Sequence, residues 1–155
     1  MASESHTAPI SLSRHTLRQL KFVLPGGLIT FWLGSHNQFW KIVKGEAEVD
    51  GWARLAALAS LGSAIVTVSL FSYILLVPLI QGQQPNYRRW REHGVLSSVI
   101  PTLTASIVLG WTALSYTLGR WSPLGYLEGV IAASGLYALV FGLLGLIPAP
   151  KVPRQ

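Results

Sequence analysis

One long stretch of the chain, residues 55–87, contains no charged side chain. Its first part, residues 55–80, is almost wholly apolar or small. A helix rises about 1.5 Å per residue, and a bilayer core of about 30 Å needs roughly 20 apolar residues, so this segment is long enough to cross a membrane. The sequence therefore predicts an integral membrane protein.

Composition supports a membrane protein of one domain. The chain has 155 residues, of which 12% are charged, against roughly 25% in a soluble globular protein. The formal charge of +6 comes from Lys and Arg that lie between the hydrophobic segments, where membrane orientation and contact with anionic phospholipids explain them. No nucleic-acid partner is predicted. The absence of cysteine excludes disulfides and thiolate metal sites.

The chain as a whole, residues 1–155, is predicted to form an all-α, polytopic bundle of membrane helices. Residues 55–80, 95–118 and 124–147 are the clearest spans, between a basic polar segment (1–21) and a basic tail (148–155). Residues 22–43 form a further predicted span, because four spans would place eight Lys and Arg on one side and four on the other. Their apolar part is short, so an interfacial or re-entrant segment stays open. Both termini are then expected in the cytoplasm or matrix.

Small side chains recur at four-residue spacing in each of the three clear spans, with Thr102, Ser106 and Gly110 as the row in residues 95–118, which predicts close helix packing. The last span carries two such rows on different faces, which indicates more than one neighbour and favours other membrane subunits or self-association. The residues of the other rows are Ala56, Ser60 and Ala64, then Gly125, Gly129 and Ala133, and finally Ser134, Ala138 and Gly142.

The loop over residues 81–94 combines basic and aromatic side chains, Tyr87, Arg88, Arg89, Trp90 and Arg91. Aromatic rings favour the membrane interface and guanidinium groups favour lipid phosphates, so contact with anionic phospholipid is the first interpretation. Docking on an acidic patch of a partner protein is the second. A catalytic role for this loop is the least favoured.

Ionisable residues inside a span are functional candidates by default. His36 and Glu128 are the candidates here, and we interpret both first as residues near the membrane surface. The three clear spans contain no His and no Met, and the four His of the chain are scattered, so no haem, metal or other cofactor is predicted.

These patterns favour a non-catalytic accessory or scaffold subunit of a larger membrane complex. An acid-poor, basic amino-terminal segment favours the mitochondrial inner membrane, with a respiratory-chain assembly as one host, over the endoplasmic reticulum. The alternative is a small membrane enzyme acting on a lipid or isoprenoid-like substrate, with His36, Glu128 and Tyr137 facing an internal cavity. A carrier or channel ranks last, because the polar residues of residues 95–118 form no continuous stripe.

Overall fold

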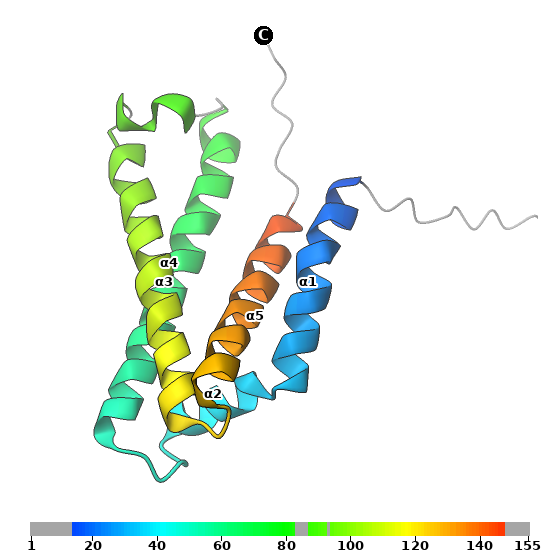
Figure 1. Cartoon of the computed structure of the whole chain (residues 1–155). Helices are drawn as coiled ribbons and strands as arrows, with labels where there is room; N and C mark the ends of the chain where they lie inside the picture. Colours follow the sequence, from blue (N-terminus) through cyan, green and yellow to red (C-terminus); the bar gives the residue numbers. More distant parts are fainter. Residues whose placement is uncertain (1–13, 83–86, 93, 148–155) are drawn as a thin grey trace, which may run out of the picture.

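Helix α5, Gly125–Gly145, packs between two antiparallel neighbours in the computed structural model of the chain (Figure 1). The structure describes residues 14–82, 87–92 and 94–147. On one side of α5 lies α1, Arg14–Trp32, and on the other lies α4, Leu96–Trp121, which in turn packs on α3, Gly51–Gln81. The spatial order is therefore α3, α4, α5, α1.

Two short helices lie at opposite ends of the bundle, measured along the axes of the long helices. Helix α2, Ser35–Lys44, lies where α1 ends and α3 begins, whereas η1, Tyr87–Glu92, joins α3 to α4 at the other end (Figure 1). The predicted all-α fold is confirmed, since the described residues form helices and no strand. Most of the predicted amino-terminal segment (1–13), parts of the 81–94 loop and the tail (148–155) lie outside the described residues.

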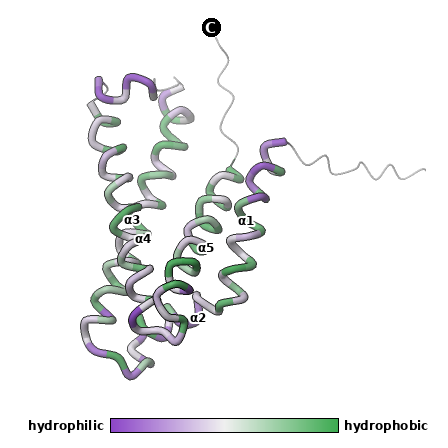
Figure 2. The backbone as a smooth tube through the Cα atoms, viewed as in Figure 1, coloured by the Kyte–Doolittle hydropathy of each residue, from purple (hydrophilic) through white to green (hydrophobic). Residues whose placement is uncertain are grey.

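Within the described residues, three helices are long and apolar enough to cross a membrane: α3 over Gly51–Pro78, α4, and α5. The predicted spans 55–80, 95–118 and 124–147 correspond to these helices. Figure 2 shows apolar residues along their length and hydrophilic residues in η1 and at the start of α1. The chain thus has the build of an integral membrane protein.

The predicted first span, residues 22–43, is divided between two helices. Helix α1 ends at Trp32, Gly34 adopts a left-handed conformation with φ 57°, and α2 begins at Ser35. Glycine reaches this conformation without the steric penalty of a side chain, so the helix ends there and the polar residues 35–38 enter α2. Helix α1 is not among the three candidate spans, and a fourth crossing stays a prediction.

Many small and hydroxyl-bearing side chains lie in the interior of the bundle beside a few leucines such as Leu118, while many large aliphatic side chains face outward. Leu109 and Leu127 are exposed, whereas Ala132 and Ala133 are fully buried. The hydroxyls of Thr67 on α3 and Ser106 on α4 share a hydrogen bond of 3.0 Å. This arrangement is typical of membrane helices, whose association depends on close packing and interhelical hydrogen bonds.

Glycines bring the backbone of α5 into near contact with both neighbours. A Cβ at Gly129 would lie 2.6 Å from the backbone nitrogen of Gly119 on α4, and one at Gly142 would lie 2.6 Å from a methyl of Val23 on α1. On α1 itself, a Cβ at Gly26 would lie 2.7 Å from the backbone nitrogen of Leu139. Both faces of α5 therefore need glycine at their closest approach.

We expect Gly129→Ala to lower the free energy of unfolding by about 1 to 3 kcal/mol, because the new methyl must push the two backbones apart. Gly62→Ala is the matched control, since a Cβ there meets no atom within 4 Å. Gly62→Ala should raise the free energy of unfolding by up to about 1 kcal/mol, because alanine favours the helix more than glycine does. Denaturant titration in detergent, followed by circular dichroism, measures both, and equal effects would contradict this packing.

Because the chain contains no cysteine, single cysteines can report the side of the membrane on which each segment lies. The variants are Arg14→Cys at the start of α1, Glu48→Cys between α2 and α3, and Glu92→Cys in η1. If α1 crosses, a membrane-impermeant maleimide should label residues 14 and 92 from the same side and residue 48 from the other. Labelling of residues 14 and 48 from one side would show that α1 does not cross.

Candidate functional site

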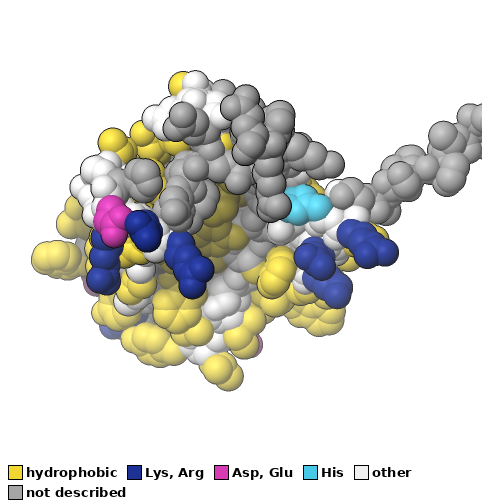
Figure 3. Space-filling view, turned by 90° about the horizontal axis from the view of Figure 1, so that it is seen from above, with side chains coloured by type: hydrophobic (Ala, Val, Ile, Leu, Met, Phe, Trp, Pro, Cys, Tyr) yellow, Lys and Arg dark blue, Asp and Glu magenta, His cyan; other side chains and the backbone are white. Residues whose placement is uncertain are grey.

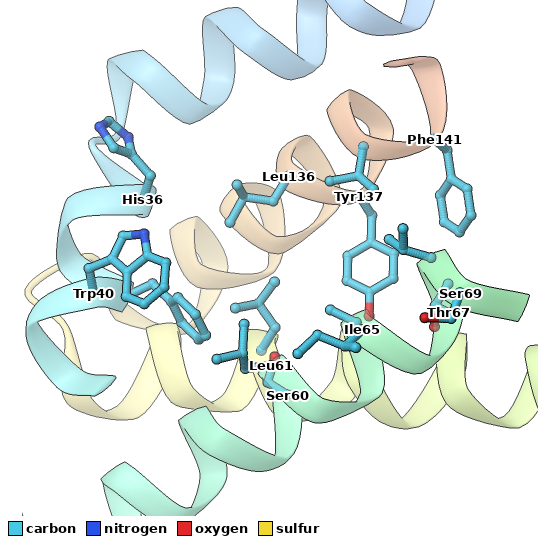
Figure 4. A pocket seen from close by; sticks show the side chains of 15 residues that line it. His36, Trp40, Ser60, Leu61, Ile65, Thr67, Ser69, Leu136, Tyr137 and Phe141 are labelled. Atoms are coloured by element: carbon cyan, nitrogen blue, oxygen red, sulfur yellow. The ribbon is translucent and has the colours of Figure 1, made fainter. Parts of the chain in front are cut away.

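A cavity of about 490 Å³ lies between α2, α3 and α5, beside a single residue of α4 (Figure 4). It opens on the side of the bundle, since the lining residues Ile65 and Val140 are 59% and 39% exposed. The lining side chains are mostly aliphatic or aromatic. They are His36, Phe39, Trp40, Ser60, Leu61, Ala64, Ile65, Thr67, Val68, Ser69, Leu114, Leu136, Tyr137, Val140 and Phe141.

The cavity exists because α3 and α5 both pack on α4 and make little contact with each other. Small residues on α3, Ser60 and Ala64, leave the space between the two helices unfilled. On the side toward η1, Phe71 of α3 and Phe141 of α5 meet edge to face with their ring centroids 5.8 Å apart. The α2 side chains border the opposite end (Figure 4).

Tyr137 supplies a buried hydroxyl to this site. Its side chain leaves α5 toward α3 (Figure 4), and its ring lies 5.9 Å from that of Phe141, centroid to centroid. A Cβ at Gly110 of α4 would collide with the Tyr137 hydroxyl, so the glycine provides the space for it. The hydroxyl forms no hydrogen bond with the described residues. Because the oxygen is buried against Gly110, a ligand could accept a hydrogen bond from it only if neighbouring side chains shifted.

His36 lies in the first turn of α2 at the other end of the cavity. Its ring contacts Phe31 edge to face with the centroids 5.4 Å apart, and its Nδ1 is buried with no hydrogen-bond partner among the described residues. In Figure 4 the imidazole and the Tyr137 hydroxyl do not point toward each other. The site therefore has two separate polar positions on an apolar wall.

Two further hydroxyls of the cavity wall, those of Ser60 and Thr67, form hydrogen bonds within the bundle. Ser60 donates to the carbonyl oxygen of Gly110 at 3.4 Å, and Thr67 donates to that of Ser63 at 2.8 Å. In the described part of the chain, no group of three His, Asp or Glu lies close enough together to hold a metal ion. The wall can bind an apolar molecule and orient one or two polar atoms of it.

The structure separates the predicted polar residues. His36 and Tyr137 line the same cavity, as do Ser60 and Ala64, whereas Glu128 is exposed in the first turn of α5 and does not line it. Ala56 lies in a different pocket, between α3 and the end of α4.

The predicted small-residue rows on α5 contact helices of the same chain. Gly129 and Ala133 face α4, and Gly142 faces α1. The Ser134 hydroxyl accepts a hydrogen bond of 3.2 Å from the indole of Trp111 on α4. Gly125 begins the helix with φ 80° and has open space around it. Ala138 is half-buried.

The basic segment, residues 87–91, forms most of η1, and none of its residues lines the central cavity. Arg89 pairs with Glu92 at 3.7 Å, and the guanidinium of Arg91 lies 5.3 Å from the centre of the Trp90 ring. Arg88 is exposed, and Tyr87 begins η1. Seen from this end, Lys and Arg side chains gather over η1 and over the start of α1 (Figure 3).

Sequence reasoning missed most of the cavity wall, including Ile65, Val68 and Phe141. These are ordinary apolar residues of membrane helices, and nothing in their spacing distinguishes residues that line a cavity from residues that contact lipid. The sequence features that could have indicated the cavity were a tyrosine in an apolar span and the small residues on α3.

Comparison of the chain with protein-family models, with curated proteins and with solved structures finds no match.

Tyr137→Phe should leave the thermal unfolding midpoint unchanged or higher, because the hydroxyl forms no internal hydrogen bond and is costly to bury. Thr67→Val is the contrasting variant: it removes the bond to Ser106 and should lower the free energy of unfolding by about 0.6 kcal/mol. Differential scanning fluorimetry of both proteins in the same detergent makes the comparison. A larger loss for the tyrosine variant would show that its hydroxyl has an internal partner.

Proposed function

We propose that the protein binds a lipid-like or isoprenoid-like molecule in the cavity between α2, α3 and α5. The observation that carries this proposal is the cavity itself: about 490 Å³ with mostly apolar walls, behind which lie two buried polar atoms without a partner among the described residues, the Tyr137 hydroxyl and His36 Nδ1. Small-molecule pockets typically measure about 300 to 1,000 Å³ and combine apolar walls with a few polar groups.

The position of the cavity indicates which molecules can reach it. Its α3 residues, 60–69, lie in the middle of a membrane-length helix, and its walls are continuous with the exposed side chain of Ile65. An unfilled apolar cavity loses dispersion contacts, so a hydrocarbon chain from the bilayer would be held there. The Tyr137 hydroxyl would donate to a carbonyl, ester or hydroxyl oxygen of that molecule.

Binding without catalysis is the form of this proposal that the geometry favours. The enzyme hypothesis needed His36, Glu128 and Tyr137 around one substrate, and Glu128 lies outside the cavity. General acid–base catalysis requires groups within hydrogen-bond reach of the reacting atoms. His36 and Tyr137 are directed to different parts of the space (Figure 4).

An accessory or scaffold role in a larger membrane complex is the second candidate. Among the described helices, α1 makes its long contact with α5, and its exposed side chains include Phe31 and Trp32, the latter 83% exposed. A helix of another subunit could pack on the side of α1 that faces away from α5. The small-residue rows of α5 give little support to external subunits, because Gly129 and Ala133 contact α4 and Gly142 contacts α1.

Location and lipid contacts follow from the charges. Basic side chains at the η1 end would contact anionic phospholipids in the cytoplasmic or matrix leaflet, and the termini would lie on that side. The acid-poor amino-terminal segment favours the mitochondrial inner membrane over the endoplasmic reticulum.

The test is to identify what the protein retains from its own membrane. Ala64→Phe should fill the cavity, and Val66→Phe, on the exposed side of the same helix, is the matched control. We expect mass spectrometry of organic extracts to find one apolar lipid in near-stoichiometric amount with the unmodified protein and the control, and a loss of about tenfold or more with Ala64→Phe, as expected when a binding volume is removed.

Equal amounts of the lipid in the two variants would contradict the proposed site. Native mass spectrometry of the same samples tests the second candidate, because a discrete assembly with other subunits would support the accessory role. Conversion of the retained molecule by the purified protein, abolished by Tyr137→Phe, would instead favour an enzyme.

A further inference from the structure

A second pocket, of about 570 Å³, lies between the first turns of α3 and the last turns of α4, at the end of the bundle opposite η1. It shares no lining residue with the central cavity. The α3 side chains that border it include the small Ala56 and Ala59, which leave a groove between the two helices. Because both helices are candidate membrane spans and the pocket lies at their ends, we expect it at the boundary between lipid head groups and chains.

Two opposite charges border the pocket without pairing. Asp50 immediately precedes α3, and its side chain caps no backbone group of that helix. Arg120 lies in the last turn of α4. Both residues are exposed, and neither belongs to the ion pairs that the described residues form. The pocket thus offers a site for an anion beside a site for a cation.

Aromatic rings border the same space. Trp52 of α3 and Tyr116 of α4 are 75% and 50% exposed, so their faces are available to a ligand. Tyr116 meets Trp121 edge to face, with ring centroids 5.2 Å apart and planes at 85°. Trp121 also packs on the buried cluster at the base of α2 and α3, which holds this pair in place. Such rings attract quaternary ammonium groups through their π faces.

We propose that this pocket binds the head group of a zwitterionic, choline-type phospholipid. Arg120 would hold the phosphate, while the rings of Trp52 and Tyr116, with Asp50, would surround the trimethylammonium group. The first part of an acyl chain would follow the groove beside Ala56. An anionic lipid would gain the arginine contact but would be repelled by Asp50, and an ordinary interfacial aromatic belt would select no head group.

The test is native mass spectrometry of the purified full-length protein, titrated with phosphatidylcholine and phosphatidylglycerol of identical acyl chains. We expect phosphatidylcholine to bind about fivefold more tightly, the ratio that corresponds to one exposed cation–π contact of about 1 kcal/mol. Arg120→Gln should reduce phosphatidylcholine binding about fivefold, whereas Arg54→Gln, an exposed arginine nearby on α3 that does not line the pocket, should not. Asp50→Asn should remove the preference by admitting phosphatidylglycerol.

Three results would overturn the proposal: equal binding of the two lipids by the unmodified protein, an equal effect of the two arginine variants, or an unchanged preference in Asp50→Asn. Ala64→Phe distinguishes this pocket from the central cavity, because it should leave the phosphatidylcholine preference intact. Loss of the preference in that variant would assign the lipid to the central cavity instead. Circular dichroism checks that each variant is folded.

Discussion

The near contact of α5 with both α4 and α1 is the constraint on which the rest of the bundle depends. Glycine at positions 129 and 142 lets backbones approach where any side chain would hold them apart. With these two faces occupied, the face of α5 that carries Leu136 and Tyr137 turns toward α3. The central cavity is therefore a by-product of tight packing elsewhere, because α3 packs along α4 and makes little contact with α5 beyond the Phe71–Phe141 pair.

The two ends of the bundle differ in chemistry. The η1 end gathers basic side chains over η1 and the start of α1, with Glu92 as a neighbouring acid. At the α2 end, basic residues such as Lys44 and Arg120 alternate with acids such as Glu46 and Asp50. A lipid at the first end meets mainly positive charge, whereas a lipid at the second meets both signs together. For this reason we assign anionic phospholipids to the η1 end and a zwitterionic phospholipid to the α2 end.

Much of the fold could be predicted from sequence, because an uncharged run of membrane length has few alternatives to a spanning helix. The break at Gly34 could not be predicted, because the apolar and polar parts of residues 22–43 are compatible both with one tilted helix and with two separate helices. The candidate site was only partly predictable: Tyr137 and His36 stood out as polar residues among apolar ones, but Glu128 did too and lies elsewhere. Which of them share a cavity depends on the angle between helices, and residue spacing within one helix carries no information on that angle.

The side opening of the central cavity, marked by the exposed side chain of Ile65, determines how occupancy would be controlled. A molecule that enters from between lipids never passes through water, so its concentration in the aqueous phase is irrelevant to binding. The governing quantity is its mole fraction in the surrounding bilayer, where every abundant lipid is a competitor. Occupancy would then report membrane composition.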